Sequence, residues 1–164
     1  MNTSINNRVS SVSRFALCVC VLGATVFLGG CNKALAPTFA AVGVREIEHN
    51  SDRSVIEFLV EATNPNKEPI PLRQITYTVM LDGVEVFSGV RSPETTLHTY
   101  SSHVFALPAV LPMGAIAGSG EVSYTLHGFA KYIPPGRLSE VLFDAEVKVP
   151  EAIIELSGTI NTGE

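Results

Sequence analysis

Histidines, cysteines and a Gly-Ser-Gly run are the residues of this chain that could do chemistry. Its four histidines are His49, His98, His103 and His127. No two have the i, i+2 or i, i+4 spacing that puts two metal ligands on one face of a strand or helix. His98 and His103 flank Tyr100-Ser101-Ser102, but a catalytic Ser-His pair also needs an orienting group and an oxyanion hole, and neither is indicated. Gly118-Ser119-Gly120 lacks the spacing of a nucleophile elbow and the Lys-Ser/Thr of a phosphate loop.

These patterns predict no enzyme, no metal site and no cofactor. The 16 acidic residues are scattered along the chain, so neither a calcium loop nor a pair of catalytic carboxylates is indicated. An envelope hydrolase remains an alternative, and it would need a pocket where His98 or His103 meets a serine and a carboxylate.

The three cysteines lie in or beside an apolar segment near the N-terminus. Two are inside the apolar run Phe15–Leu28, and the third, Cys31, follows it after two glycines. Two arginines and no acidic residue precede the run. A basic start, an apolar core and small residues before a cut are typical of a secretory signal peptide. An uncleaved transmembrane helix is the alternative, but it needs about 20 apolar residues, more than this run provides.

The sequence Leu28-Gly29-Gly30-Cys31 resembles the lipobox of bacterial lipoproteins. The resemblance implies that Cys31 receives a lipid on its sulfur and that residues 1–30 are removed as a signal peptide. Residues 31–37 would then form a lipidated tether, and residues 38–164 the folded domain. The expected location is the cell envelope, with the membrane bound through the lipid. Asn32, where an Asp would mark inner-membrane retention, favours the periplasmic face of the outer membrane in a Gram-negative organism.

The chain after the expected cut is acidic and has no free thiol. Arg8 and Arg14 precede Cys31 and all 16 acidic residues follow it, so 9 basic residues remain and the formal net charge is −7. Nucleic acid is therefore not an expected partner, because phosphate binding needs clusters of Lys and Arg. With Cys18 and Cys20 removed and Cys31 acylated, the domain would contain no disulfide and no thiolate metal site.

From Thr38 onward the apolar residues recur with a period of two, and turn signals are frequent. This pattern is typical of a β-sandwich or barrel. The alternation is clearest at Ile56, Phe58, Val60 and Ala62, and again at Ile75, Tyr77, Val79 and Leu81. We expect strands at 38–49, 54–63, 73–81, 84–90, within 95–107, and at 121–131, 139–149 and 153–160. About seven strands predict an all-β antiparallel sandwich of the immunoglobulin or fibronectin-III kind.

Two turn motifs stand out between the expected strands. Asn64 and Asn66 would bond the backbone of their own turn through their side chains, and Pro65 presets its φ. A ligand-binding role for the two asparagines is the alternative, but turn chemistry favours the structural role. Asp82-Gly83 suits a two-residue type I′ hairpin, because both residue types tolerate positive φ.

The domain resembles the type 2 late-embryogenesis-abundant domain, also called the water-stress and hypersensitive-response (WHy) domain. The resemblance rests on Phe58-x-Val60-x-Ala62-x-Asn64-Pro65-Asn66, on Pro69-Ile70-Pro71-Leu72, on Ile75-x-Tyr77-x-Val79-x-Leu81-Asp82-Gly83 and on Tyr124-x-Leu126-x-Gly128. It implies a folded sandwich without catalysis that acts in desiccation and stress tolerance. The alternative is a binding module that recognises an envelope protein or a ligand through loops at Pro69–Leu72 and Met113–Gly120.

Overall fold

The computed structural model describes residues 34–49, 53–112, 114–116 and 120–161. Most of them lie in strands, and the expected all-β fold is confirmed. The strands are β1 (Thr38–His49), β2 (Arg53–Thr63), β3 (Ile70–Leu81), β4 (Val84–Arg91), β5 (Thr95–Leu97), β6 (Ser102–Pro112), β7 (Glu121–Tyr132) and β8 (Glu151–Asn161). A short helix, α2 (Ser139–Asp144), lies between β7 and β8. No helix within the described ranges has the length and apolar character needed to cross a membrane.

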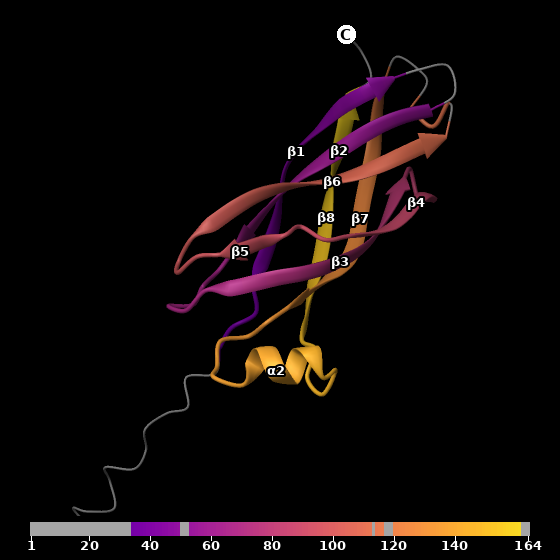
Figure 1. Cartoon of the computed structure of the whole chain (residues 1–164). Helices are drawn as coiled ribbons and strands as arrows, with labels where there is room; N and C mark the ends of the chain where they lie inside the picture. Colours follow the sequence, from indigo (N-terminus) through magenta and orange to yellow (C-terminus); the bar gives the residue numbers. More distant parts are fainter. Residues whose placement is uncertain (1–33, 50–52, 113, 117–119, 162–164) are drawn as a thin grey trace, which may run out of the picture. The chain divides into compact units, whose positions relative to one another are not determined.

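The strands form two antiparallel sheets packed face to face (Figure 1). One sheet has three strands in the order β1-β2-β6, and the other has the order β4-β3-β7-β8. The short β5 pairs with the start of β3, on the edge that β4 occupies further along. Edge strands of the two sheets also lie beside each other, β1 against β8 and β4 against β6.

The core lies between the sheets and is built from the alternating residues of β2 and β3. Ile56, Phe58 and Val60 face Ile75, Tyr77 and Val79, and all six are buried. The rings of Phe58 and Tyr124 pack across the sheets with their centroids 4.9 Å apart. The predicted core faces of both strands are therefore confirmed, since burial of alternate side chains is what selects the register.

A second, smaller cluster of buried residues lies at the end of the sandwich where β2 ends and β3 begins. Its members are Ala62, Ile70, Leu72, Leu97, Tyr132 and Ala152. They come from five strands, including the three-residue β5. This cluster supports the loop between β2 and β3, which carries the two asparagines.

Bulges change the expected faces of β1. The sequence predicts Val42 and Val44 on one face, but Val42 is exposed whereas Val44 packs on the core. A register shift between Ala41 and Gly43 inserts one extra residue opposite β2, and a second lies between Glu46 and Glu48. A bulge of this kind reverses the side-chain alternation at the inserted residue.

Two prolines lie inside strands although the sequence predicts that they interrupt pairing. Pro71 belongs to β3, which begins at Ile70 rather than Arg73, and Pro108 belongs to β6. The Pro71 carbonyl accepts the Ile133 N–H (3.0 Å), and the Pro108 carbonyl accepts the Tyr77 hydroxyl proton. The N–H and C=O of a strand residue point to the same side, so neither proline nitrogen faces the strand opposite, β5 or β2.

The expected strand at 139–149 is wrong, because this segment contains α2. Helical bonds join Leu142 N to Leu138 O and Ala145 N to Val141 O, both at 3.0 Å. One edge of β7 pairs with β3 and the other pairs along its whole length with β8. The intervening residues therefore have no free edge of β7 to join, and their backbone bonds are made locally.

We expect Gly128→Ala to destabilise the fold by about 1–3 kcal/mol, the usual effect of forcing atoms into a packed site. A Cβ at this position would lie 2.3 Å from Thr76 O and 2.9 Å from Tyr77 Cβ, and the first of these is backbone that cannot move aside. Gly43→Ala is the matched control, because a Cβ there meets nothing within 4 Å. Denaturant unfolding measures both, and equal midpoints for the two variants would contradict the close approach of β7 to β3.

Tyr77 should make stability fall at alkaline pH. Burial raises the pKa of Tyr77 to about 12, against a smaller opposing effect of the positive charge of Arg91. The folded protein therefore holds this proton more tightly than the unfolded chain, whose tyrosine pKa is about 10, so stability is lost as the pH rises through 10 to 12. Tyr77→Phe removes the ionisable hydroxyl and its bond to Pro108 O. We expect it to cost about 1 kcal/mol at pH 7 and to flatten the alkaline decline.

Unfolding measured from pH 8 to pH 12 in both proteins tests this. An unchanged slope in the variant would show that Tyr77 is not the titrating group. Burial also raises the pKa values of Tyr124 and Tyr132, so part of the decline should remain.

Candidate functional site

Asn64 is the most deeply buried polar residue among the described ones, with an exposed fraction of 0%. Its side-chain amide donates to three backbone carbonyls, Glu68 O (2.8 Å), His98 O (3.0 Å) and Leu97 O (3.2 Å). Its Oδ1 accepts from the backbone N–H of Asn66 at 2.9 Å. This side chain therefore closes its own turn and also binds the segment that links β5 to β6.

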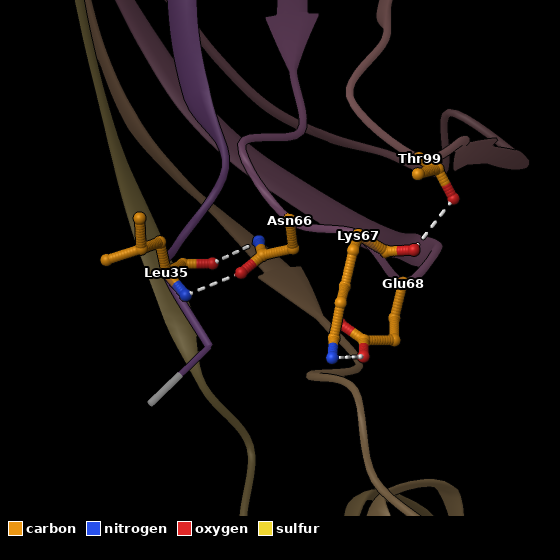
Figure 2. A network of polar contacts seen from close by, with 5 residues as sticks. All are labelled: Leu35, Asn66, Lys67, Glu68 and Thr99. Carbon is orange, nitrogen blue, oxygen red and sulfur yellow. Dashed lines mark hydrogen bonds and ion pairs between the residues drawn. The ribbon is translucent and has the colours of Figure 1, made fainter. Parts of the chain in front are cut away.

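The sequence predicts that Asn66 bonds the backbone of its own turn, but its side chain binds the chain just before β1. Its Oδ1 accepts the Leu35 N–H (2.8 Å), and its Nδ2 donates to Leu35 O (2.9 Å) and to Asn64 Oδ1 (3.0 Å). Figure 2 shows the Asn66 amide and the Leu35 backbone facing each other through the first two of these bonds. The amide thus pairs with Leu35 as a peptide group of a neighbouring strand would.

Backbone bonds complete the connection to the β5–β6 segment. Asn64 N donates to Ser101 O (2.9 Å), and Tyr100 N donates to Asn66 O (3.1 Å). Tyr100 has a φ of +47°, in the left-handed region. Thr99 Oγ1 donates to Lys67 O at 3.0 Å, as Figure 2 shows. We call Asn64, Asn66 and the groups they bind the asparagine clasp. It joins three segments, at residue 35, residues 64–68 and residues 97–101.

The domain begins earlier than residue 38. The compact unit that contains the sandwich starts at Ala34. Pro37 is buried, and Leu35 is bound at both backbone groups by the clasp. Part of the segment interpreted as a tether is therefore packed on the domain.

Asp82 and Gly83 form the hairpin turn between β3 and β4, and both have positive φ, +46° and +81°. Asp82 also contacts β7, because its Oδ1 accepts from the backbone N–H of Ser123 (3.1 Å) and from the Ser123 hydroxyl (2.8 Å). The Asp82 N–H donates in turn to Ser123 O at 2.9 Å. This turn residue fixes the hairpin to the neighbouring strand.

The histidines and serines singled out in the sequence are not brought together in the described part of the chain. His98, His103 and His127 are exposed. The Ser101 hydroxyl donates a hydrogen bond to the backbone oxygen of His98 at 2.9 Å, so the His98 imidazole takes no part in this contact. Three or more His, Cys, Asp or Glu side chains do not group as a metal site anywhere in those ranges. Cys31, Cys18, Cys20 and Ser119 lie outside the described residues, as does the side chain of His49.

The interior of the asparagine clasp consists of neutral amide side chains and backbone groups. Among the described residues, no nucleophilic or basic side chain takes part in its buried hydrogen bonds. The sequence located the two asparagines through the local signal of an Asn-Pro-Asn turn. It did not locate their partners Leu35 and Leu97–Ser101, because these lie about 30 residues away and no pattern of types or spacing links them.

Comparison with known families agrees with this architecture. Residues 59–139 match the LEA_2 family. The description of that family is "Late embryogenesis abundant protein", and the match covers β3 to β7 together with residues 64–68 of the clasp, here called the clasp loop. The sandwich accordingly has a LEA_2-like fold. A comparison with curated protein sequences found no match.

Two solved structures resemble this chain in their fold. The solution structure of AT1g01470 from Arabidopsis thaliana is 18% identical and superposes with a TM-score of 0.60, covering 85% of this chain and 91% of that one. The solution structure of At2g46140.1, whose description assigns it to the late embryogenesis abundant (LEA) proteins, is 14% identical with a TM-score of 0.61. That likeness covers 99% of this chain and 95% of the other. At these identities the likeness shows the fold.

We expect Asn64→Ala to destabilise the sandwich domain by about 3 kcal/mol or more, because each buried group left without a partner costs about 1–3 kcal/mol. The groups released are the Glu68, Leu97 and His98 carbonyls and the Asn66 N–H. Asn64→Asp keeps the acceptor but loses the donors, so it too should destabilise.

Thr99→Val is the control for this prediction, since it removes one exposed hydrogen bond in the same region. It should cost less than about 1 kcal/mol. Chemical unfolding compares the three variants with the wild type. If Asn64→Ala costs no more than Thr99→Val, the clasp does not stabilise the domain as described.

Proposed function

We propose that this is a lipid-anchored protein of the cell envelope whose LEA_2 domain acts without catalysis in protection against desiccation and related stress. The single observation that carries the protective role is the LEA_2 match at residues 59–139. The Leu28-Gly29-Gly30-Cys31 sequence supports the anchor. A diacylglyceryl group with a further amide-linked chain meets the need for at least two acyl chains in stable membrane attachment.

The outer face of the five-stranded sheet supports a role that depends on hydration. In the centre of this face, paired strands present Thr76, Thr78, Thr125, His127 and Ser157. Glu155 lies opposite His127, and the chain from Cys31 onward has a net charge of −7. Hydroxyl and carboxylate groups retain water through hydrogen bonds, so this surface would stay hydrated and separate neighbouring envelope components as water is withdrawn.

A binding module is the second candidate function, and the three-stranded sheet favours it more than the loops do. Val104 and Val110 are exposed on the outer face of β6, opposite Glu61 and Val55 of β2 respectively. The loops considered from the sequence do not form one site. Pro69 lies just before β3, at one end of the five-stranded sheet. Gly120 lies just before β7, whose first residues extend past the last residue of β3, at the opposite end of the sheet. An envelope protein would therefore dock on the sheet face.

We expect the mature protein from its native membrane to have the mass of residues 31–164 plus two or three acyl chains. Cys31→Ser should abolish the lipid mass and block cleavage before residue 31, because the thiol that accepts the lipid is gone. Intact-mass spectrometry measures both results. An uncut wild-type chain without lipid would overturn the anchor.

Survival after drying tests the protective role. A strain with the gene deleted should survive controlled drying less well than its parent. Wild-type protein should restore survival, and Asn64→Ala should not if the domain unfolds. Equal survival of deletion and parent strains over several drying regimes would overturn this role, while a saturable partner captured by the wild type but not by Val104→Ser would favour the binding module.

A further inference from the structure

The short helix α2 exposes apolar side chains and buries none of its residues. Leu138, just before the helix, is 66% exposed, Val141 within it is 63% exposed, and Val147 after it is 72% exposed. Large apolar side chains this exposed are common singly on protein surfaces. Here three of them lie within ten residues of sequence on one projecting element.

The helix separates Leu138 and Val141 from its charged residues. Leu138, Val141 and Ala145 follow the i, i+3, i+7 spacing that places side chains in one stripe. Arg137, Glu140 and Asp144 follow the same spacing one position earlier. Glu140 forms an ion pair with Arg73 of β3, at 3.2 Å. Glu140 of the charged stripe is thus paired with the sheet, while Leu138 and Val141 of the other stripe are exposed.

The chain enters the domain at the same end of the sandwich as α2. α2 follows β7, whose last residue Tyr132 pairs with Leu72 near the start of β3. The clasp loop leads directly into β3 and binds Leu35, which is itself 60% exposed. In Figure 1, α2 lies at the end of the sandwich where β3 begins.

We propose that Leu138, Val141 and Val147 rest on the surface of the bilayer that holds the lipid of Cys31. This inference depends on the lipid anchor proposed above. Cys31 is four residues before Leu35, a distance of at most about 14 Å in an extended chain. Because the clasp fixes Leu35, acyl chains inserted in a bilayer must bring this end of the domain close to the headgroups.

The chemistry of the segment suits a docked position. At six residues the helix rises only about 9 Å, so it lies at the interface and does not enter deeply. Arg137 and Lys148 flank the apolar residues, and their long stems let the charge stay among headgroups. Glu140, Asp144 and Glu146 make the segment acidic overall, so attachment relies on apolar burial and needs no anionic lipid. Three apolar side chains suffice because the anchor makes docking intramolecular.

Lipid quenching of a fluorophore on α2 tests the proposal. Full-length Val141→Cys protein is produced in the native host, its lipid content is verified by intact mass, and it is reconstituted in phosphatidylcholine vesicles containing doxyl-labelled lipid. Once Cys31 is acylated and residues 1–30 are removed, the new thiol is the one that reacts with the label. Val84→Cys is the matched control, since Val84 is 64% exposed but follows the Asp82-Gly83 turn at the far end of β3.

We expect several-fold stronger quenching at position 141 than at position 84, and the difference should persist in high salt. Adding Leu138→Asn and Val147→Asn should lower the quenching at 141 to the control level while the lipid mass and vesicle retention stay unchanged. A lipidated protein with equal quenching at both positions overturns the docking and leaves the anchor in place. A protein without lipid overturns both. Self-quenching at 141 that depends on protein density instead of quenching by lipid overturns it in favour of a second copy of the chain.

Discussion

Asn64 places a polar amide at a position with no exposure to solvent, so each of its hydrogen-bonding atoms must be matched by the protein itself. The match is complete: the amide nitrogen meets three carbonyls, and the oxygen meets the N–H and the amide of Asn66. Among the described residues no buried side-chain nitrogen or oxygen lacks a partner. Because an unpaired buried amide is costly, the loops around Asn64 have essentially one acceptable arrangement.

That requirement organises a whole end of the domain. The β2–β3 loop and the β5–β6 segment are held together by the amide, and both cover the small cluster around Ile70, Leu72 and Leu97. Asn66 in turn binds Leu35 and so fixes the segment before β1 to the β2–β3 loop. The end of the sandwich through which the chain enters is therefore fixed.

Alternation was sufficient to predict β2 and the main part of β3, because both strands have one face in the core and their side chains report it directly. It failed for β1, where a bulge at Val42 places Val42 and Val44 on opposite faces and no composition signal marks a bulge. The sequence also did not predict that Pro71 and Pro108 lie within strands. Whether a proline nitrogen faces a neighbouring strand depends on the assembled sheet. α2 was missed because its helix depends on both edges of β7 being occupied.

The contacts of the candidate site are likewise of two kinds, local ones that the sequence indicates and distant ones that it does not. Asn64 and Asn66 were found from a local turn signal, and their bond to each other is local. Their contacts with Leu35 and Leu97 are set by the three-dimensional arrangement of the two sheets. A single sequence carries the local signal but not the pairing of distant segments.

The pairing of Leu35 with Asn66 also determines how the domain bears mechanical load. Tension applied through the preceding residues reaches the N–H and C=O of Leu35, and both are bonded to one amide. The two bonds are loaded together and must break together, whereas the ladder between β1 and β2 could open one pair at a time from Thr38. One side chain thus shields the first strand from peeling, and a pull on the chain must overcome Asn66 before it can begin to unfold the sandwich.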